Sequence, residues 1–290
     1  MKKDFLSITD LTKEELNDLL DLAAQQKRGA TSSVLAKKQI ALYFEKPSLR
    51  TKASFEVGIQ ELGGQFSYFS TDEVGKMGER ESVDDFAKVL SGYFDTVVAR
   101  VFDHVNLERF ASASKIPVVN ALSDHEHPCQ ILADLLTIKE KLGRLDNFKL
   151  AYLGDGNNVA LSLALAAGIL GFEFVLTGPK KYQLEDSQVR QTENLAEALQ
   201  NAEVIYTDTW NSMGEPKKSD ETILNPFQLN AAALQKAQKN AIVLHCLPAH
   251  RGQEITDEVI DGPQSAVFAQ AANRLPAQKA LLIKIFSKKL

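Results

Sequence analysis

Short apolar runs alternate with helix-forming stretches along most of this chain, and that alternation constrains the fold more than any other feature. Residues 40–44 and 96–99 are apolar runs of strand length, and each is followed by a stretch with the spacing of a helix. Strands that alternate with helices form parallel sheets whose two faces are both covered. The sequence therefore predicts an α/β fold.

The alternation occurs twice, which predicts two domains. A chain of 290 residues is long for one hydrophobic core. Residues 143–147 separate a first strand–helix series from a second series that starts at Leu150. We expect one domain over residues 1–134 and another over residues 148–270, each a parallel β-sheet flanked by helices. A C-terminal helix over residues 275–290 is expected to pack back on the first domain.

Composition and charge exclude several classes of partner. The formal net charge is −5 with no long basic run, which argues against nucleic acid. Cys129 and Cys246 are too few for a disulfide framework and favour a reducing compartment. No apolar run approaches the ~20 residues of a membrane span. The first residues lack the apolar core of a signal peptide. We expect a cytoplasmic protein that contacts no membrane.

Polar and charged side chains gather where the expected strands end. In α/β sheets, binding sites lie at the carboxyl ends of the strands. Six segments occupy such places: residues 48–51, Arg100, and residues 127–130, 154–158, 208–214 and 245–248. Their shared placement predicts a functional site at the strand ends.

The segment after the first strand has the features of a phosphate site. Ser48, Arg50 and Thr51 stand where the next helix should begin. A helix N-terminus offers unpaired N–H groups and a partial positive charge, and an arginine adds fork-shaped donors. The alternative is that Ser48 only caps the helix.

A second group of residues has the features of an electrophilic site. Arg100, His127 and Gln130 could converge on a carbonyl oxygen and stabilise charge that develops on it. The alternative is an ordinary loop histidine with satisfied hydrogen bonds.

The loop at residues 208–215 and the cysteine at position 246 each allow two interpretations. Asp208 could hold an amine while the glycine-containing loop closes over it, or the loop could be a surface loop anchored by Trp210. Cys246 fits an inert buried thiol better than a nucleophile, because no known Cys–His–Asn or Cys–His–Asp order is present.

The turn at residues 154–158, Gly-Asp-Gly-Asn-Asn, matches a dinucleotide-binding turn only in part. The third glycine is missing, and no acidic residue ends the next strand. The two asparagines could instead hold a carboxylate or an amino group. His125 with His127, and His245 with Cys246, lack the spacing of a structural zinc site. We expect neither a cofactor nor a metal.

Taken together, these segments closely resemble the aspartate/ornithine carbamoyltransferase superfamily. FEKPSLRT at residues 44–51 resembles its carbamoyl-phosphate signature, and Arg100 and HPCQ at residues 127–130 match further positions for that substrate. GDGNN at residues 154–158, Asp208 with SMG at residues 212–214, and HCLP at residues 245–248 resemble segments of the ornithine enzymes. The resemblance extends from about residue 6 to residue 284.

The resemblance implies transfer of the carbamoyl group from carbamoyl phosphate to the δ-amine of L-ornithine, giving L-citrulline and phosphate. It implies a carbamoyl-phosphate-binding first domain, an ornithine-binding second domain and an active site in the cleft between them. The amine would attack directly in a ternary complex, and positioning and electrostatics would supply most of the catalysis. Such an enzyme belongs to arginine metabolism and amino-acid biosynthesis.

The resemblance also implies roles for individual residues. Carbamoyl phosphate would be bound by Ser48, Leu49, Arg50, Thr51, Lys76, Arg100, His127 and Gln130. Ornithine would be bound by Asn158, Asp208, Ser212, Met213, Cys246 and Leu247. The catalytic residues would be Arg100, His127, Asp208, Cys246 and Arg274. Arg274 would contact the developing carbonyl oxygen from the second domain.

Four features depart from the family pattern. Leu49 replaces the usual threonine, Lys76 stands where ornithine enzymes often carry a polar residue or histidine, and Leu161 replaces a common histidine. Residues 177–194 are short for the usual helix and strand, so one surface helix is expected to be missing. The loop at residues 71–81 would reach a neighbouring subunit's site. That implies a homotrimer, or a multiple of trimers, in which Lys76 contacts phosphate in trans.

Two alternatives stay open. The acceptor could be another amine, such as aspartate, putrescine or an N-acylated ornithine. The chain could also be a binding protein that kept the fold and lost catalysis. Ser212 to Gly214 and Cys246 favour free ornithine, and the full set of polar residues favours an enzyme.

Overall fold

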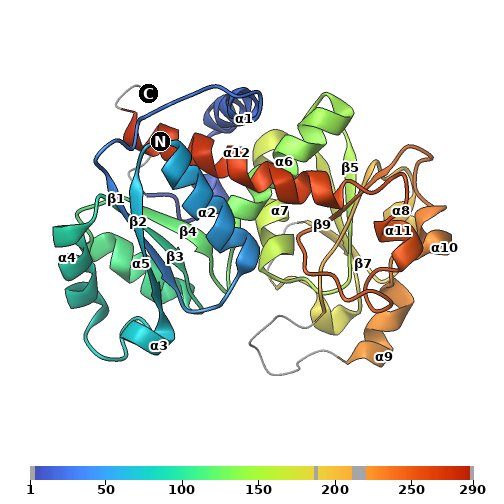
Figure 1. The fold of residues 1–290 in the computed structure, drawn as a ribbon. Coiled ribbons are helices and arrows are strands. Elements are labelled where there is room, and N and C mark those ends of the chain that lie inside the picture. Colours follow the sequence, from blue (N-terminus) through green and yellow to red (C-terminus); the bar gives the residue numbers. More distant parts are fainter. Residues whose placement is uncertain (1–3, 186–188, 211–219, 288–290) are drawn as a thin grey trace. The chain divides into compact units, whose positions relative to one another are not determined.

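Two parallel β-sheets, each flanked by helices, form the part of the chain that the structure describes, which confirms the predicted α/β fold (Figure 1). In this computed structural model the described residues are 4–185, 189–210 and 220–287. The chain divides into two compact units. Unit 1 comprises Met1–Leu136 and Asn273–Leu290, and unit 2 comprises Thr137–Ala272.

Unit 1 is built on a four-stranded sheet with the order β2-β1-β3-β4. Its parallel strands are β1 (Gln39–Phe44), β2 (Gln65–Ser70), β3 (Thr96–Arg100) and β4 (Val118–Leu122). Its helices are η1 (Ile8–Asp10), α1 (Lys13–Lys27), α2 (Leu49–Glu61), α3 (Thr71–Val74), α4 (Val83–Tyr93) and α5 (His104–Ala113). Helices α6 (Pro128–Leu142) and α12 (Val267–Phe286) have residues in both units.

The core of unit 1 follows from the alternation of side chains along each strand. One set of strand side chains packs against α4 and α5 in a cluster that includes Ala41, Tyr43, Ala87, Leu90, Val97, Ala99, Leu107 and Phe110. The intervening strand residues point to the opposite face, where α2 and the end of α12 lie (Figure 1). Gly58 lets these two helices approach closely, since a Cβ there would lie 3.3 Å from the Cγ of Lys279.

Unit 2 is built on a five-stranded parallel sheet with the order β7-β6-β5-β8-β9. Its strands are β5 (Lys149–Leu153), β6 (Glu173–Thr177), β7 (Arg190–Thr192), β8 (Val204–Thr207) and β9 (Ile242–His245). Its helices are α7 (Asn158–Leu170), η2 (Lys180–Tyr182), α8 (Leu195–Leu199), α9 (Glu221–Leu224), η3 (Asn225–Phe227), α10 (Ala231–Leu234) and α11 (Asp257–Ile260). Ala151, Leu153, Ile205 and Val243 pack with residues of α8, α10 and α11 to form its core.

Several elements differ from the sequence expectations. The loop expected at residues 71–81 begins with the short helix α3, and the helix expected around residues 229–237 is the single turn α10. The last helix begins well before residue 275. A surface helix was expected to be missing from residues 177–194. Among the described residues of that segment, the structure has the single helical turn η2 and the short strand β7.

Both sheets change winding direction after their first strand. In unit 1, β1 lies between β2 and β3, and in unit 2, β5 lies between β6 and β8. At such a switch point, the connections that leave two neighbouring strands run in opposite directions, and a crevice forms outside the carboxyl ends of these strands. The six predicted site segments lie at or after the ends of β1, β3, β4, β5, β8 and β9, and those of β1, β3, β5 and β8 lie at the two switch points. In the described ranges, no helix combines the length and the apolar character needed to span a bilayer.

Candidate active site

The first group of site residues lies where α2 begins, at the carboxyl end of β1. Ser48 caps α2, since its hydroxyl accepts a hydrogen bond from the N–H of Thr51 at 3.3 Å. The capping role that the sequence allowed for Ser48 is therefore present. Leu49, the residue that departs from the family pattern, is 81% exposed and lies outside the core of unit 1. The same turn presents Arg50 at the positive end of the helix.

Arg274, which the resemblance assigns to the second domain, lies with this first group in unit 1 of the structure. Its Nη2 donates to the hydroxyl of Thr51 at 3.1 Å, and its Nη1 donates to Oε1 of Gln130. The side chain is 2% exposed. The boundary between the units falls inside α12, so a helix that begins in unit 2 delivers this arginine to unit 1. Arg274 thereby links two predicted carbamoyl-phosphate residues.

His127 stands directly before α6 and is 5% exposed. Burial, followed by the positive charges of Arg274, Arg100 and Arg50, holds the pKa of His127 well below its usual 6.5. The imidazole is therefore neutral near pH 7 and carries one N–H. A neutral N–H donor can polarise a carbonyl oxygen without adding a buried charge.

Gln130 and Arg100 complete this first group. Gln130 is 2% exposed and its Nε2 donates to Asp134 at 2.8 Å, which fixes the orientation of the amide whose oxygen meets Arg274. Arg100 ends β3, opposite Phe44 in the β1–β3 register. Its Nε donates to the backbone oxygen of Lys46 at 3.2 Å. The ends of β1 and β3 are thus joined through a cationic side chain.

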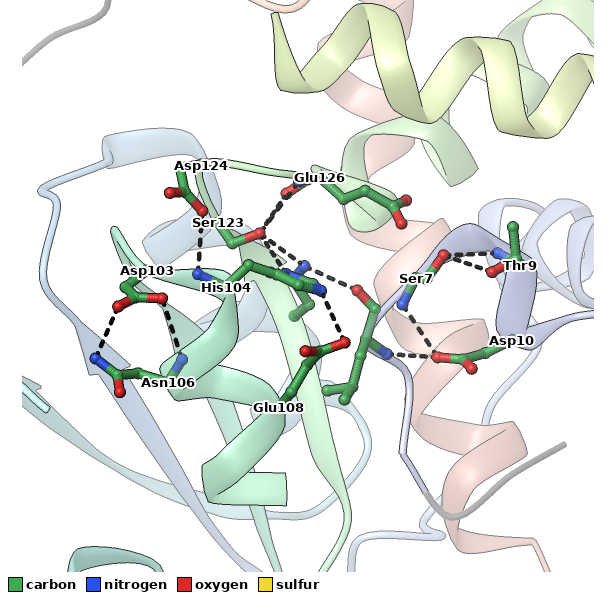
Figure 2. Close-up of polar contacts among 12 residues, drawn as sticks. Ser7, Thr9, Asp10, Asp103, His104, Asn106, Glu108, Ser123, Asp124 and Glu126 are labelled. Atoms are coloured by element: carbon green, nitrogen blue, oxygen red, sulfur yellow. Dashed lines mark hydrogen bonds and ion pairs between the residues drawn. The ribbon is translucent and has the colours of Figure 1, made fainter. Parts of the chain in front are cut away.

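A tight turn from Ser123 to Glu126 (Figure 2) lies directly before His127 in the sequence. The N–H of Ser123 donates to the carbonyl oxygen of Glu126 at 2.8 Å, and the N–H of Glu126 donates back to the Ser123 hydroxyl at 3.1 Å. That hydroxyl also lies 2.8 Å from Nδ1 of His104. The buried Glu126 carboxylate accepts from the N–H of Ile8 at 3.2 Å. The chain entering α6 is therefore fixed from both sides.

Lys76 lies in the segment between α3 and α4 and is exposed. Its ammonium nitrogen lies 5.2 Å from the centre of the Phe102 ring of the same chain. The contact in trans that the resemblance implies for Lys76 stays a prediction.

The second group of site residues lies in unit 2, around Asp208. Oδ1 of Asp208 accepts from the Cys246 thiol at 2.8 Å and from the N–H of Thr209 at 2.7 Å. Oδ2 accepts from Nδ2 of Asn157 at 2.7 Å. The residue is 7% exposed. Two predicted residues, Asp208 and Cys246, are therefore in direct contact, and the carboxylate is held in one orientation by three donors.

Asn157 and Asn158 begin α7 at the end of the β5 turn. Asn157 is the N-cap, and its Oδ1 accepts from the N–H groups of Val159 and Ala160 at 2.9 and 3.1 Å. The hydroxyl of Tyr152 donates to the same oxygen at 3.0 Å. Asn157 consequently links the helix start to Asp208. Asn158, the predicted ligand, is the first residue of the helix.

A buried histidine–carboxylate pair supports the segment that contains Cys246. His245 Nε2 lies 3.0 Å from Oε1 of Glu254, and both side chains are fully buried. Nδ1 of His245 accepts from the N–H of Leu247 at 2.8 Å, so the ring hydrogen is on Nε2 and points to Glu254. Leu247 has a positive φ of 57° and precedes a cis proline bond. The imidazole thus holds the backbone of Leu247 in an uncommon conformation.

Asp208, His245 and Cys246 are the group of described residues that could hold a metal, because one donor atom from each lies within 4.8 Å of the others. Both nitrogens of His245 are already engaged, and the Cys246 thiol donates to Asp208. A metal ion could bind there only by displacing these hydrogen bonds.

Sequence reasoning missed several residues of this second group. Glu254 and His250 belong to it, since the N–H of His250 donates to Glu254 at 2.6 Å and Nδ1 of His250 lies 2.9 Å from the Thr209 hydroxyl. No local pattern marks them. Asn157 could have been identified, because it belongs to the same Asn-Asn pair as Asn158. Ser212 and Met213 lie outside the described residues.

Two family models match the chain, one over each half. A family model described as the aspartate/ornithine carbamoyltransferase carbamoyl-phosphate-binding domain matches residues 3–140. A second, described as the aspartate/ornithine-binding domain of the same family, matches residues 146–285. The chain therefore belongs to the aspartate/ornithine carbamoyltransferase family.

Within that family, the chain is similar over its whole length to ornithine carbamoyltransferases. It is 48% identical to the enzyme of Methanocorpusculum labreanum over 305 aligned positions, covering 99% of both chains. It is 44% identical to the enzyme of Bacillus subtilis, covering 99% of this chain and 94% of that one. The solved structure of ornithine carbamoyltransferase from Pyrococcus furiosus matches with a TM-score of 0.93 and 40% identity, covering 99% of this chain and 98% of that chain.

Proposed function

We propose that this chain transfers the carbamoyl group of carbamoyl phosphate to the δ-amine of L-ornithine, giving L-citrulline and phosphate. The observation that carries the proposal is a pair of hydrogen-bonded polar groups, one in each unit. Arg274, Thr51 and Gln130 form the first in unit 1, and Asp208 and Cys246 form the second in unit 2. The first group suits an anionic donor with a carbonyl, and the second suits an amine. Relatives of matching length that carry the ornithine carbamoyltransferase name support ornithine as the acceptor.

The residues of unit 1 would bind and polarise the donor. Ser48, Leu49 through its backbone, Arg50, Thr51 and Lys76 would hold the phosphate, which leaves as a dianion. Arg100, His127, Gln130 and Arg274 would stabilise the charge that grows on the carbamoyl oxygen as the amine attacks. The neutral state of His127 suits this role, because an imidazolium beside three arginines would be costly to bury.

The residues of unit 2 would hold and activate the acceptor. Asn158, Ser212, Met213 and Leu247 would bind the amino-acid portion of ornithine. Asp208 would attract the δ-ammonium, and Asp208 with Cys246 would lie beside the nitrogen as it loses its proton and attacks the carbamoyl carbon. No covalent enzyme intermediate is needed, so positioning and electrostatics would supply the rate enhancement.

An acceptor panel tests this function. The purified protein should form citrulline from carbamoyl phosphate and ornithine, and should use aspartate, putrescine and N-acetylornithine far more slowly. If the protein preferred one of the other three amines, that amine would be the acceptor and the assignment of ornithine would be wrong. Tight binding of carbamoyl phosphate without any turnover would identify a binding protein instead.

The proposal includes a homotrimer, or a multiple of it, in which residues 71–81 reach a neighbouring site. Subunit complementation tests this arrangement. Arg50→Ala and Lys76→Met trimers should each be impaired. If Lys76 acts in trans, exchanging their subunits should restore some activity, because a chain with intact Arg50 then receives intact Lys76. Absence of recovery after demonstrated exchange, or an active monomer in sedimentation, would contradict shared sites.

We further place the activity in arginine metabolism, as amino-acid biosynthesis in the cytoplasm. Two cysteines without a disulfide framework are compatible with a reducing compartment. Restored growth of an arginine-requiring host that lacks this step would support the assignment. Fractionation of the source cells would test the compartment.

A further inference from the structure

Glu45 connects the segment around Lys76 to the end of the sheet in unit 1. Its Oε1 accepts from the N–H of Met77 at 2.9 Å and from the Tyr43 hydroxyl at 3.0 Å. Its Oε2 accepts from the N–H of Phe102 at 2.9 Å. The Tyr43 hydroxyl also lies 3.1 Å from the carbonyl oxygen of Gly75. The Glu45 carboxylate therefore joins Met77, which follows Lys76, to Phe102, which follows β3 by two positions, and Tyr43 contacts both this carboxylate and Gly75.

The Phe102 ring gathers positive charge at the same place. The ammonium nitrogen of Lys46 lies 4.4 Å from the ring centre, and that of Lys76 lies 5.2 Å from it. Both distances are within the ~6 Å range of cation–π attraction. Lys46 is only 5% exposed, and its backbone oxygen accepts from Arg100. Two lysines and an arginine are consequently held together at the carboxyl ends of β1 and β3.

An aromatic partner has a consequence that a carboxylate partner would not have. A ring stabilises an ammonium group without bringing a negative charge of its own close to a bound anion. The Glu45 carboxylate is engaged by backbone N–H groups and by the Tyr43 hydroxyl. Glu45 thus orders the backbone, and Phe102 places the cations.

We propose that Glu45 and Phe102 are positioning residues for carbamoyl phosphate. Glu45 joins the Lys76 segment to β3, and Phe102 holds the ammonium groups of Lys46 and Lys76, so that both residues set the place from which Lys76 reaches the phosphate in the neighbouring subunit. This inference rests on the proposed function for the identity of the anion. Neither residue is assigned a contact with substrate. Both act through the lysines and the backbone that they hold.

Glu45→Gln separates a positioning role from a purely electrostatic role, because the two roles predict opposite changes in the affinity for carbamoyl phosphate. All three groups that meet the carboxylate are donors, so a glutamine would turn its own N–H donors toward at least one of them. A positioning role predicts that carbamoyl phosphate binds about tenfold more weakly. A purely electrostatic role predicts tighter binding, because a negative charge near the anion has been removed.

Glu79→Gln is the charge-matched control. Its Oε2 accepts from the N–H of Lys76 at 2.8 Å, a contact that stays within the Lys76 segment and that a glutamine oxygen can keep. The dissociation constant for carbamoyl phosphate is measured by calorimetry, and the KM values for both substrates by citrulline assay. A rise in the carbamoyl-phosphate values for Glu45→Gln alone, with an unchanged ornithine KM, supports the proposal. Equal effects of the two variants, or tighter binding, would overturn it.

Phe102→Leu and Phe102→Tyr provide a test that does not depend on how Glu45→Gln folds. Phe102→Leu should weaken carbamoyl-phosphate binding by roughly three- to tenfold. Phe102→Tyr keeps an aromatic face and should bind carbamoyl phosphate about as tightly as the native chain. Equal values for leucine and tyrosine would overturn the proposal. If the native chain binds carbamoyl phosphate but makes no citrulline, the proposed acceptor fails while these binding comparisons stand. If it does not bind carbamoyl phosphate, both proposals fail.

Discussion

At the scale of single residues, burial and neighbouring charge decide the protonation state on which the chemistry depends. His127 is buried near Arg274, Arg100 and Arg50, and its pKa is held well below 6.5. Cys129, two residues later, is fully buried, and burial raises the pKa of its thiol to about 12. Its Sγ donates to the backbone oxygen of Asn120 at 3.2 Å, which makes Cys129 structural.

His127 should make the protein less stable in acid. Above pH 6.5 the imidazole is neutral in both the folded and unfolded chain. Below that value the unfolded chain takes up a proton that the folded chain does not, so stability falls as the pH falls. The slope for this one group approaches about 1.4 kcal/mol per pH unit. Urea unfolding at several pH values between 7.5 and 5 should show a shallower loss for His127→Gln. Parallel curves would show that His127 titrates normally.

Asp208→Asn should impair ornithine use and leave carbamoyl-phosphate binding intact. The three donors that meet the carboxylate would face an amide that is itself partly a donor, and the charge that attracts an ammonium would be lost. A charge-assisted contact of this kind corresponds to roughly a tenfold to hundredfold loss in kcat/KM for ornithine. Steady-state kinetics with each substrate varied checks this. Equal loss for both substrates would indicate misfolding instead.

At the scale of elements, the ends of adjacent strands come close enough to require glycine. Gly154 follows β5 with a φ of 109°, and Gly178 follows β6. A Cβ on Gly178 would lie 2.1 Å from the carbonyl oxygen of Gly154. The N–H of Gly154 donates to Thr177 at 2.9 Å, which joins the two strand ends. The turn that leads to Asn157 is therefore shaped by a close backbone approach.

Gly178→Ala should destabilise the protein by about 1–3 kcal/mol, because backbone atoms must move to admit the methyl group. Since the displaced atoms belong to the turn before Asn157, the KM for ornithine should also rise. Gly168→Ala in α7 is the control. A Cβ there meets nothing within 4 Å, and alanine should stabilise the helix by about 0.5–1 kcal/mol. Chemical denaturation of the two variants compares them. A stable Gly178→Ala variant would contradict the close approach.

At the scale of the whole molecule, the residues proposed to bind carbamoyl phosphate come from distant parts of the chain. Thr51, Gln130 and Arg274 meet in unit 1, although they are separated by up to 223 positions in the sequence. A ligand that bridges such residues stabilises the folded state as a whole, by about 2.7 kcal/mol at a hundredfold excess over its Kd.

Carbamoyl phosphate should therefore raise the thermal unfolding midpoint of the native protein. Arg50→Ala should lose most of that increase, because a charge-assisted contact to the phosphate is removed. Asp208→Asn should keep it, because Asp208 belongs to the acceptor group in unit 2. Thermal unfolding with and without the donor measures this. An undiminished increase for Arg50→Ala would place the phosphate elsewhere.

The sequence by itself determined the fold class, several helix starts and the family. Thr12 and Ser82 cap α1 and α4, and such a cap can be identified from the sequence because it depends on residues three positions apart. Parallel sheets followed from the alternation of strands and helices. The family followed from segments that keep their residue types in order, and each of these signals is local.

Only the tertiary structure decided how the site residues are held. Arg274 was expected in the second domain, but the boundary between units lies inside α12, which no sequence break marks. Glu254 beside His245 and Phe102 beside Lys46 depend on the packing of different elements. Hydrogen bonds and cation–π contacts act over a few ångströms. Which distant residues come that close is decided by the fold of the whole chain.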